Sequence, residues 1–195
     1  KASILTYIIY LIARPVTQLY STPEKSPITS WAYSILGQIY VVLPLALLGV
    51  WGYKSDYQLF MNTEYLLMAL FVFVWTNDTG AYIVGCTLGK HRLFERISPK
   101  KSWEGFFGGL AFCIILASLA NYIIPGMLST AQWIGMGILI SIFSTWGDLC
   151  ESLLKRTAGV KDSGKILPGH GGILDRFDSE LIASPVIFIY LTFVL

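Results

Sequence analysis

The sequence predicts an all-α protein, a polytopic transmembrane helical bundle with its functional loops on the cytoplasmic side. The chain is 54% hydrophobic and only 13% charged, whereas a typical soluble domain carries about 25% charged residues. No charged residue or histidine occurs from Gly105 to Gly147. Because a helix needs about 20 apolar residues to cross the hydrocarbon core, this run fits two crossings joined by a turn at Pro125-Gly126.

Composition also argues against several other classes of protein. The net charge of +2 gives no reason to expect nucleic-acid binding. Cys86, Cys113 and Cys150 are too far apart for a zinc site or a disulfide framework, so we expect buried, inert thiols. Lys1 precedes one apolar run and Leu195 ends inside another, so we expect a fragment of a longer membrane protein.

The N-terminal third is predicted to hold two spans. Ala2–Ala13 looks like the end of the first span, with Arg14-Pro15 stopping the helix. Gln18–Ser30 is predicted to be a loop. Trp31–Trp51 is a second span with tryptophan at both ends, as expected at membrane interfaces. Gly52–Thr63 follows as a short polar loop.

A third span begins near Glu64 and is predicted to be interrupted by the polar run Thr76–Gly80 before it resumes at Ala81–Gly85. An ionisable side chain at membrane depth is costly and indicates function. We therefore expect Asp78 to belong to the functional site, although a helix cap at the interface would be the simpler alternative.

Three further spans complete the prediction. The fourth is Gly105–Ile124, where Gly105 and Gly109 have the spacing that permits close helix packing. The fifth is Gln132–Asp148, and the sixth begins after Glu180.

Ten of the fourteen Lys and Arg residues lie in two segments, Gly89–Trp103 and Ser152–Asp178. Two predicted crossings separate these segments, so both lie on one side of the membrane, and the excess of positive charge makes that side cytoplasmic. Topology alone would explain the lysines and arginines. It would not explain the aspartates, glycines and histidine that accompany them in Ser152–Asp178.

Carboxylates in and beside this segment are spaced for a metal site. Asp148 shares one helical face with a stripe of polar residues at i+3, i+4 and i+7, namely Glu151, Ser152 and Lys155. Asp175 and Asp178 are also one helical turn apart. Three carboxylates around a phosphate-sized space would repel each other unless a cation joined them, and such oxygen ligands suit Mg²⁺ shared with substrate phosphates. We predict that Asp148, Asp175 and Asp178 hold Mg²⁺.

The run Pro168-Gly169-His170-Gly171-Gly172 lies between these carboxylates. Its glycines allow the backbone to approach a ligand closely, and the surrounding lysines and arginines would neutralise phosphate oxygens. Neither the glycines nor the histidine is specific alone. Their combination with the carboxylates indicates a phosphate-and-metal site at a membrane surface.

The pattern Ser152-x-x-Lys155-Arg156, Lys161-Asp162, Pro168–Gly172 and Asp175-Arg176-x-Asp178 resembles the signature of the phosphatidate cytidylyltransferase (CDP-diacylglycerol synthase) family. Asp78–Tyr82 and Ile97–Gly105 also resemble upstream elements of that family. The resemblance covers about residues 65–195. We call Ser152–Asp178 the signature segment.

The resemblance implies an integral membrane enzyme of phospholipid biosynthesis, in the plasma membrane if the source is bacterial. It would use CTP, phosphatidic acid and Mg²⁺ and form a homodimer in the lipid bilayer. Residues 1–63 would be N-terminal transmembrane helices, truncated at the start, and residues 64–195 the catalytic transmembrane domain, with the signature loop at 148–178. The implied catalytic residues are Asp148, Asp175, Asp178, Lys155, Arg156 and Lys161. The implied substrate-binding residues are Asp78, Lys100, Lys101, Ser152, Lys165, His170, Gly171, Gly172 and Arg176.

Two alternatives remain. A related CTP-dependent enzyme could act on an ether-lipid or polyprenol acceptor, because the signature reads nucleotide and phosphate rather than acyl chains. An ion-coupled transporter or channel could instead use Asp78 and Asp148 to line an ion path. That second class predicts polar residues spread through the spans, whereas here they gather towards one predicted membrane face.

Overall fold

The computed structural model describes residues 2–20, 26–52, 63–166, 168–169 and 171–195. It divides into two compact units, Lys1–Leu43 and Pro44–Leu195. The first unit contains α1 (Ala2–Leu19), α2 (Pro27–Gly37) and a short π-helical segment, η1 (Gln38–Val42). Helix α3 (Leu43–Gly52) follows η1 directly in the chain.

The predicted helix stop at Arg14-Pro15 is wrong. Helix α1 continues to Leu19 with Pro15 inside it. The Arg14 side chain donates hydrogen bonds at 2.9 Å to Ser30 Oγ and at 3.2 Å to Gln18 Oε1, and the Arg14 carbonyl accepts from Thr17 Oγ1 at 2.9 Å. The Arg14 side chain and carbonyl thus find hydrogen-bond partners within the first unit. The connection predicted as Gln18–Ser30 is shorter than expected, because α1 ends at Leu19 and α2 begins at Pro27.

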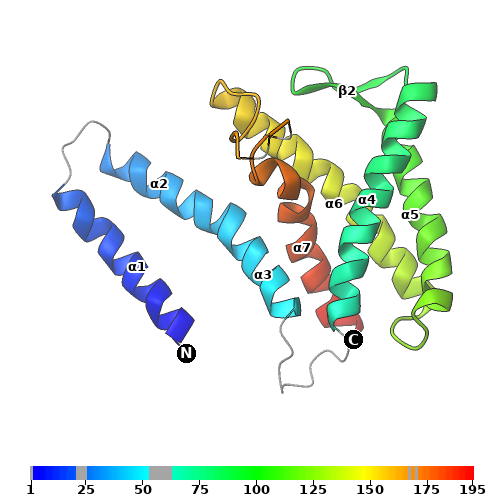
Figure 1. Ribbon diagram of the computed structural model, residues 1–195, viewed down its shortest axis with the longest axis horizontal. Helices are drawn as coiled ribbons and strands as arrows, with labels where there is room; N and C mark the ends of the chain where they lie inside the picture. The colour runs from blue at the N-terminus through cyan, green and yellow to red at the C-terminus, as the bar shows by residue number, and fades with distance from the viewer. Residues whose placement is uncertain (1, 21–25, 53–62, 167, 170) are drawn as a thin grey trace. The chain divides into compact units, whose positions relative to one another are not determined.

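The second unit is built on four long helices and one strand pair (Figure 1). The helices are α4 (Thr63–Leu88), α5 (Trp103–Ile123), α6 (Thr130–Thr157) and α7 (Leu174–Val194). The strands are β1 (Arg92–Phe94) and β2 (Ser98–Ser102), which pair antiparallel. The predicted polar loop Gly52–Thr63 falls mostly on residues 53–62, outside the described residues.

Among the described residues, five helical segments are long and apolar enough to cross a membrane. They are Pro27–Gly49, Glu64–Leu88, Trp103–Ile123, Thr130–Thr157 and Leu174–Val194. The helical membrane fold and the membrane localisation are therefore confirmed. The first predicted span, Ala2–Ala13, lies in α1, which is not one of the five. Helix α6 extends nine residues beyond the predicted end at Asp148, and α7 begins before Glu180.

The core of the second unit lies among its long helices. Phe73 of α4 stacks on Trp133 of α6 with ring centroids 6.2 Å apart, and Leu70, Cys113 and Ile187 are fully buried around them. Of the cysteines, only Cys113 is buried, so the prediction of buried thiols is wrong for Cys86 and Cys150, which are exposed. The apolar interior sets the four helices side by side and leaves their ends to carry the polar groups.

The predicted break at Thr76–Gly80 does not occur, because α4 runs through it. The buried Asn77 side chain is satisfied by α6: it accepts from Ser141 Oγ at 2.7 Å and donates to Ser144 Oγ at 3.1 Å. Gly109 of α5 makes room for this network, since an added Cβ would lie 2.5 Å from Asn77 Oδ1. The close packing predicted for the Gly105–Gly109 face is thus confirmed.

The basic segment Gly89–Trp103 folds into the β1–β2 hairpin and is anchored at the start of α5. Glu104 accepts backbone hydrogen bonds from Lys90 and His91 and pairs with His91 Nδ1 at 2.6 Å. Ser102 Oγ caps α5 by accepting from Gly105 N at 3.1 Å. Figure 1 shows that the hairpin and the C-terminal end of α6 lie at the same end of the unit, opposite the α5–α6 turn.

Candidate functional site

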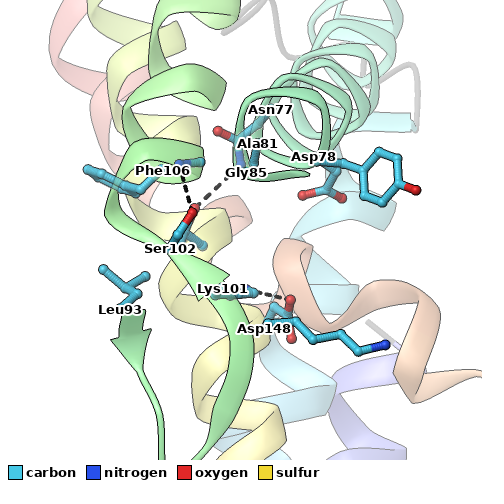
Figure 2. Close-up of a pocket in the computed structure, with 13 residues that line it drawn as sticks. Asn77, Asp78, Ala81, Gly85, Leu93, Lys101, Ser102, Phe106 and Asp148 are labelled. Carbon is cyan, nitrogen blue, oxygen red and sulfur yellow. Dashed lines mark hydrogen bonds and ion pairs between the residues drawn. The ribbon is translucent and has the colours of Figure 1, made fainter. Parts of the chain in front are cut away.

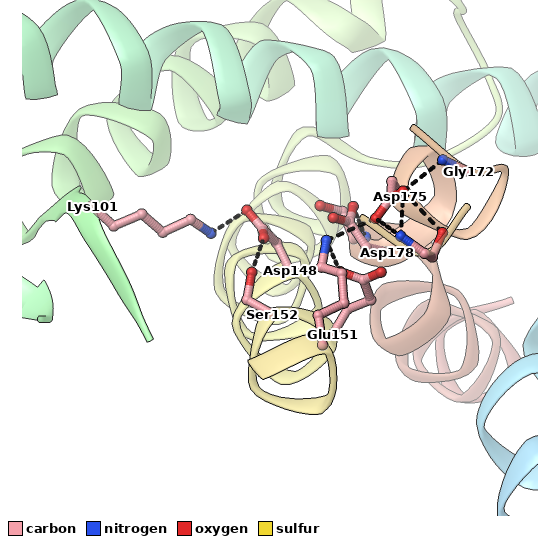
Figure 3. Close-up of polar contacts among 10 residues, drawn as sticks. Lys101, Asp148, Glu151, Ser152, Gly172, Asp175 and Asp178 are labelled. Atoms are coloured by element: carbon pink, nitrogen blue, oxygen red, sulfur yellow. Dashed lines mark hydrogen bonds and ion pairs between the residues drawn. The ribbon is translucent and has the colours of Figure 1, made fainter. Parts of the chain in front are cut away.

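Asp148, on α6, joins the basic hairpin to the signature segment (Figure 3). Its Oδ2 forms an ion pair with Lys101 Nζ of β2 at 2.5 Å. Its Oδ1 accepts a hydrogen bond from Ser152 Oγ at 3.2 Å, one helical turn further along α6. The structure therefore brings together three predicted site residues from two segments that are far apart in the sequence.

Two more carboxylates act on the same centre. Asp148 repels both Asp78 of α4 and Asp178 of α7, and Lys101 attracts both of them. Asp178 Oδ1 accepts from the Ser179 backbone N–H at 2.7 Å. Asp78 and Asp178 therefore lie within electrostatic range of the Lys101–Asp148 pair, and three carboxylates against one lysine leave an excess of negative charge.

A second ion cluster lies one turn further along α6. Lys155 Nζ pairs with Glu151 of the same helix and with Asp175 Oδ1 of α7, the latter at 2.8 Å. Glu151 is almost completely buried. Because a buried charge is costly unless it is paired, this cluster fixes the end of α6 to the start of α7.

Asp175 also holds the signature segment in place. Its Oδ2 accepts hydrogen bonds from Ser163 N at 2.9 Å, Ser163 Oγ at 2.9 Å and Gly172 N at 2.7 Å. Gly171 has a φ of +82°, and an added Cβ would lie 2.6 Å from Asp175 Oδ2. Glycine is required there for both its conformation and its size. We call Glu151, Lys155, Asp175 and Ser163 the clasp.

On the other side of Asp148 is a cavity of about 260 Å³ between α4, the hairpin, α5 and α6 (Figure 2). Polar groups at Asp78, Lys101 and Asp148 line one part of it, and Ala81 and Phe106 line another. We call this cavity the hairpin pocket. It lies beside the Lys101–Asp148 pair and has both Asp78 and Asp148 in its lining, while their membership of one functional site stays a prediction.

The remaining predicted site residues lie at the same end of the unit. Five side chains are exposed: Lys100, Arg156, Lys161, Lys165 and Arg176. Gly172 is buried against Ser163 and Gly164. His170 lies outside the described residues.

The predicted metal ligands do not form a compact set. In the described part of the chain, no three His, Cys, Asp or Glu side chains are grouped closely enough to hold a metal ion together. The carboxylate oxygens of Asp175 are occupied by the clasp, whereas Asp148 and Asp178 repel each other across the site. Mg²⁺ commonly uses one or two carboxylates together with substrate phosphates, so the donor set of Asp148 and Asp178 fits that ion.

Comparison with known proteins agrees with this geometry. Residues 1–194 match the model of the family described as "Cytidylyltransferase family". The chain belongs to the cytidylyltransferase family.

Several curated members of this family are similar to the chain. It is 41% identical over 160 residues to a phosphatidate cytidylyltransferase of Staphylococcus aureus (strain COL). It is 41% and 40% identical, over 159 residues each, to proteins of that name from Staphylococcus haemolyticus and Staphylococcus epidermidis. In each case the match covers 82% of this chain and 61% of the relative. The chain therefore spans less than two thirds of the length of these cytidylyltransferases.

Sequence reasoning missed three residues in and beside this site. Glu151 was visible only as part of a polar stripe, yet it is the buried partner of Lys155. Ser163 carried no signal, because its role depends on the fold that returns Asp175 to it. Glu180 is buried on α7 near Asp78 and Asp178, and its Oε2 accepts no hydrogen bond from the described residues.

Proposed function

We propose that the full-length protein is a phosphatidate cytidylyltransferase, which transfers CMP from CTP to phosphatidate and gives CDP-diacylglycerol and pyrophosphate. The observation that carries this proposal is the position of Asp148. One carboxylate contacts the basic hairpin through Lys101 and the polar stripe through Ser152, nine residues before the end of a helix long and apolar enough to cross a membrane. A water-soluble nucleotide and a lipid phosphate could meet at such a place.

The reaction needs positioning more than proton transfer. An oxygen of the lipid phosphate forms a bond to the α-phosphorus of CTP. The bond from that phosphorus to the oxygen that bridges to the β-phosphate breaks, and pyrophosphate leaves with the electron pair. A phosphate monoester has a second pKa of about 6, so the nucleophile is already mostly a dianion at neutral pH. The obstacle is repulsion between two anions, which positive charges reduce.

Mg²⁺ is part of this proposal, with Asp148 and Asp178 as its protein ligands. Bound there, the ion would neutralise phosphate charge and orient the reacting groups. Asp175 remains a predicted third ligand, but its hydrogen bonds to Ser163 and Gly172 give it a structural role that needs no metal.

The exposed cations of the signature segment would bind the triphosphate. Lys161 and Lys165 lie in the loop between α6 and α7, and Arg156 and Arg176 lie on its flanking helices. Lys155 would act mainly through Asp175, because it is already paired with two carboxylates. His170, Gly171 and Gly172 remain predicted substrate contacts.

The proposal includes the location and assembly that the sequence predicts. The site would face the cytoplasm, where CTP is found, and the helices would lie in a lipid bilayer. Residues 64–195 would be the catalytic domain and residues 1–63 an N-terminal helical region. A homodimer remains part of the proposal on the basis of resemblance alone.

One assay tests the activity directly. Purified full-length protein with labelled CTP and phosphatidate should form CDP-diacylglycerol, and EDTA should abolish product formation until Mg²⁺ is restored. Ether-lipid and polyprenyl phosphates serve as competing acceptors. Faster turnover of either one than of phosphatidate would contradict the assigned acceptor, and no CDP-lipid from any acceptor would contradict the function.

A further inference from the structure

The hairpin pocket and the signature segment differ in what they can bind. Both lie against Asp148, on opposite sides of it, so a two-substrate reaction at Asp148 could use one side for each substrate. On the basis of the proposed function, we propose that the hairpin pocket binds the phosphate and glycerol of the acceptor lipid. CTP then binds on the side of the signature segment.

The pocket offers cations for a phosphate monoester, although the carboxylates of Asp78 and Asp148 line it as well. Two lysines line it, Lys100 and Lys101, and both come from β2. Lys101 is engaged with Asp148, whereas no ion pair of Lys100 is found in the described part of the chain. A phosphate dianion would contact both ammonium groups, and charge-assisted hydrogen bonds of this kind are about twice as strong as neutral ones.

The signature segment offers more positive charge. Besides Lys155, which is already paired with two carboxylates, its cations are Arg156, Lys161, Lys165 and Arg176. Its loop also contains Gly169 and Gly171 with positive φ, which lets the backbone turn tightly. This set suits the several charges of a triphosphate better than the two lysines of the pocket do.

The apolar wall of the pocket reaches the lipid-facing surface. Tyr82, on α4, lines the pocket and is 72% exposed. Because α4 is long and apolar enough to cross a membrane, its exposed side would face lipid there. Phe106 and Gly85 continue the wall inward beside Lys101 and Asp78 (Figure 2). A lipid can therefore place its phosphate near Asp148 while its acyl chains stay in the bilayer.

The size of the pocket gives a test that leaves the charges unchanged. A Cβ added at Gly85 would lie 3.5 Å from Ser102 Oγ and 3.6 Å from Gly105 Cα, which are ordinary contacts. Gly85→Ala should therefore fold while it narrows the pocket. Gly49→Ala on α3 is the matched control, because its added methyl group meets no atom within 4 Å.

The experiment measures the KM of each substrate separately, with full-length protein in nanodiscs. Gly85→Ala should raise the KM for phosphatidate about threefold, and Lys100→Gln should raise it about tenfold, the value of one hydrogen bond to a charged group. The KM for CTP should stay unchanged in both variants, and Gly49→Ala should match wild type.

Two results would overturn the assignment while leaving the proposed function intact. One is a rise, relative to wild type, in the KM of these variants for CTP rather than for phosphatidate. The other is no change in either KM. Failure of the proposed function is a different outcome, since wild-type protein would then form no CDP-diacylglycerol at all. Binding of short-chain phosphatidate without CTP supplies a second readout: it should weaken in Lys100→Gln, and unchanged binding would also overturn the assignment.

Discussion

On the side of the signature segment, Lys155 is paired with Glu151 and Asp175, whose side chains are 1% and 8% exposed. On the side of the hairpin pocket, Lys101 and Asp148 are 26% and 34% exposed. Both lysines join α6 to another element by ion pairs. Burial favours the clasp as a persistent structural link, whereas the partial solvation of Lys101 and Asp148 would lower the cost of exchanging partners with a substrate.

Removing the clasp lysine should have the largest effect. Lys155→Met leaves two buried carboxylates without a cation, and breaking a buried ion pair in this way typically costs about 3–5 kcal/mol. Thermal unfolding of the detergent-solubilised protein measures the loss. Lys101→Met is the matched variant and should cost about 0.2–1 kcal/mol, as for exposed pairs. Equal losses in the two variants would contradict the distinction between the two sides.

Removing a predicted metal ligand should abolish activity without unfolding the protein. Asp148→Asn and Asp178→Asn keep the side-chain size and relieve repulsion, so both should purify normally. Loss of the metal interaction should lower kcat by about a hundredfold or more. Glu95→Gln, an exposed acid in the hairpin turn, is the charge-matched control. Near-normal turnover in both aspartate variants would remove the metal assignment.

Asp175→Asn separates the two roles of that residue. If Asp175 acts through the clasp, the variant should unfold at a lower temperature as well as lose activity, because four donors lose a charged acceptor. A purely metal-binding role predicts lost activity with unchanged stability. Thermal unfolding measured beside turnover distinguishes these outcomes.

Neutralising both hairpin lysines should have a smaller effect on catalysis. Lys100→Gln with Lys101→Gln should weaken substrate binding by about tenfold or more. In wild type, the contribution of these two lysines to substrate affinity should fall as the salt concentration rises, because exposed charges are screened within about 8–10 Å at physiological ionic strength. Titration at several salt concentrations checks this result. Unchanged KM values together with altered membrane topology would mean that these lysines serve only orientation.

The smallest expected effect concerns the hydrogen bonds that Asn77, at the wall of the hairpin pocket, makes with Ser141 and Ser144. Ser141→Ala removes one hydrogen bond between helices, and such bonds are worth about 0.6 kcal/mol on average and 1.7 at most. Ser118→Ala is the control, because Ser118 Oγ donates within its own helix, to the Ile114 carbonyl. If thermal unfolding shows no difference between the two variants, the network does not stabilise the bundle.

Much of the fold could be predicted from the sequence, because charge-free runs have few alternatives to spanning helices. Errors arose where the folded chain satisfies a polar group in a way that the sequence does not reveal. Thr76–Gly80 looked like a break, but Thr76 Oγ1 donates to the Val72 carbonyl at 2.7 Å and α6 satisfies Asn77. The hairpin was missed because its anchor, Glu104, belongs to the next helix.

The site was also predicted only in part. Asp148, Lys101 and Ser152 were named in advance, since charge near a span end is visible in sequence. The clasp role of Asp175 was not, because it depends on backbone N–H groups of Ser163 and Gly172 that only the folded loop presents. The Asp148 and Asp178 metal assignment stays a prediction.

The Asn77 network also constrains how the protein enters the membrane. Because α6 follows α4 and α5 in the chain, the Asn77 amide of α4 gains its Ser141 and Ser144 partners only once α6 has been synthesised. Helices α4 and α6 have mean hydropathies of 1.4 and 1.3, against 1.9 for α5 between them. The buried Asn77 therefore couples the stability of α4 in the membrane to α6, a helix that follows it in the chain.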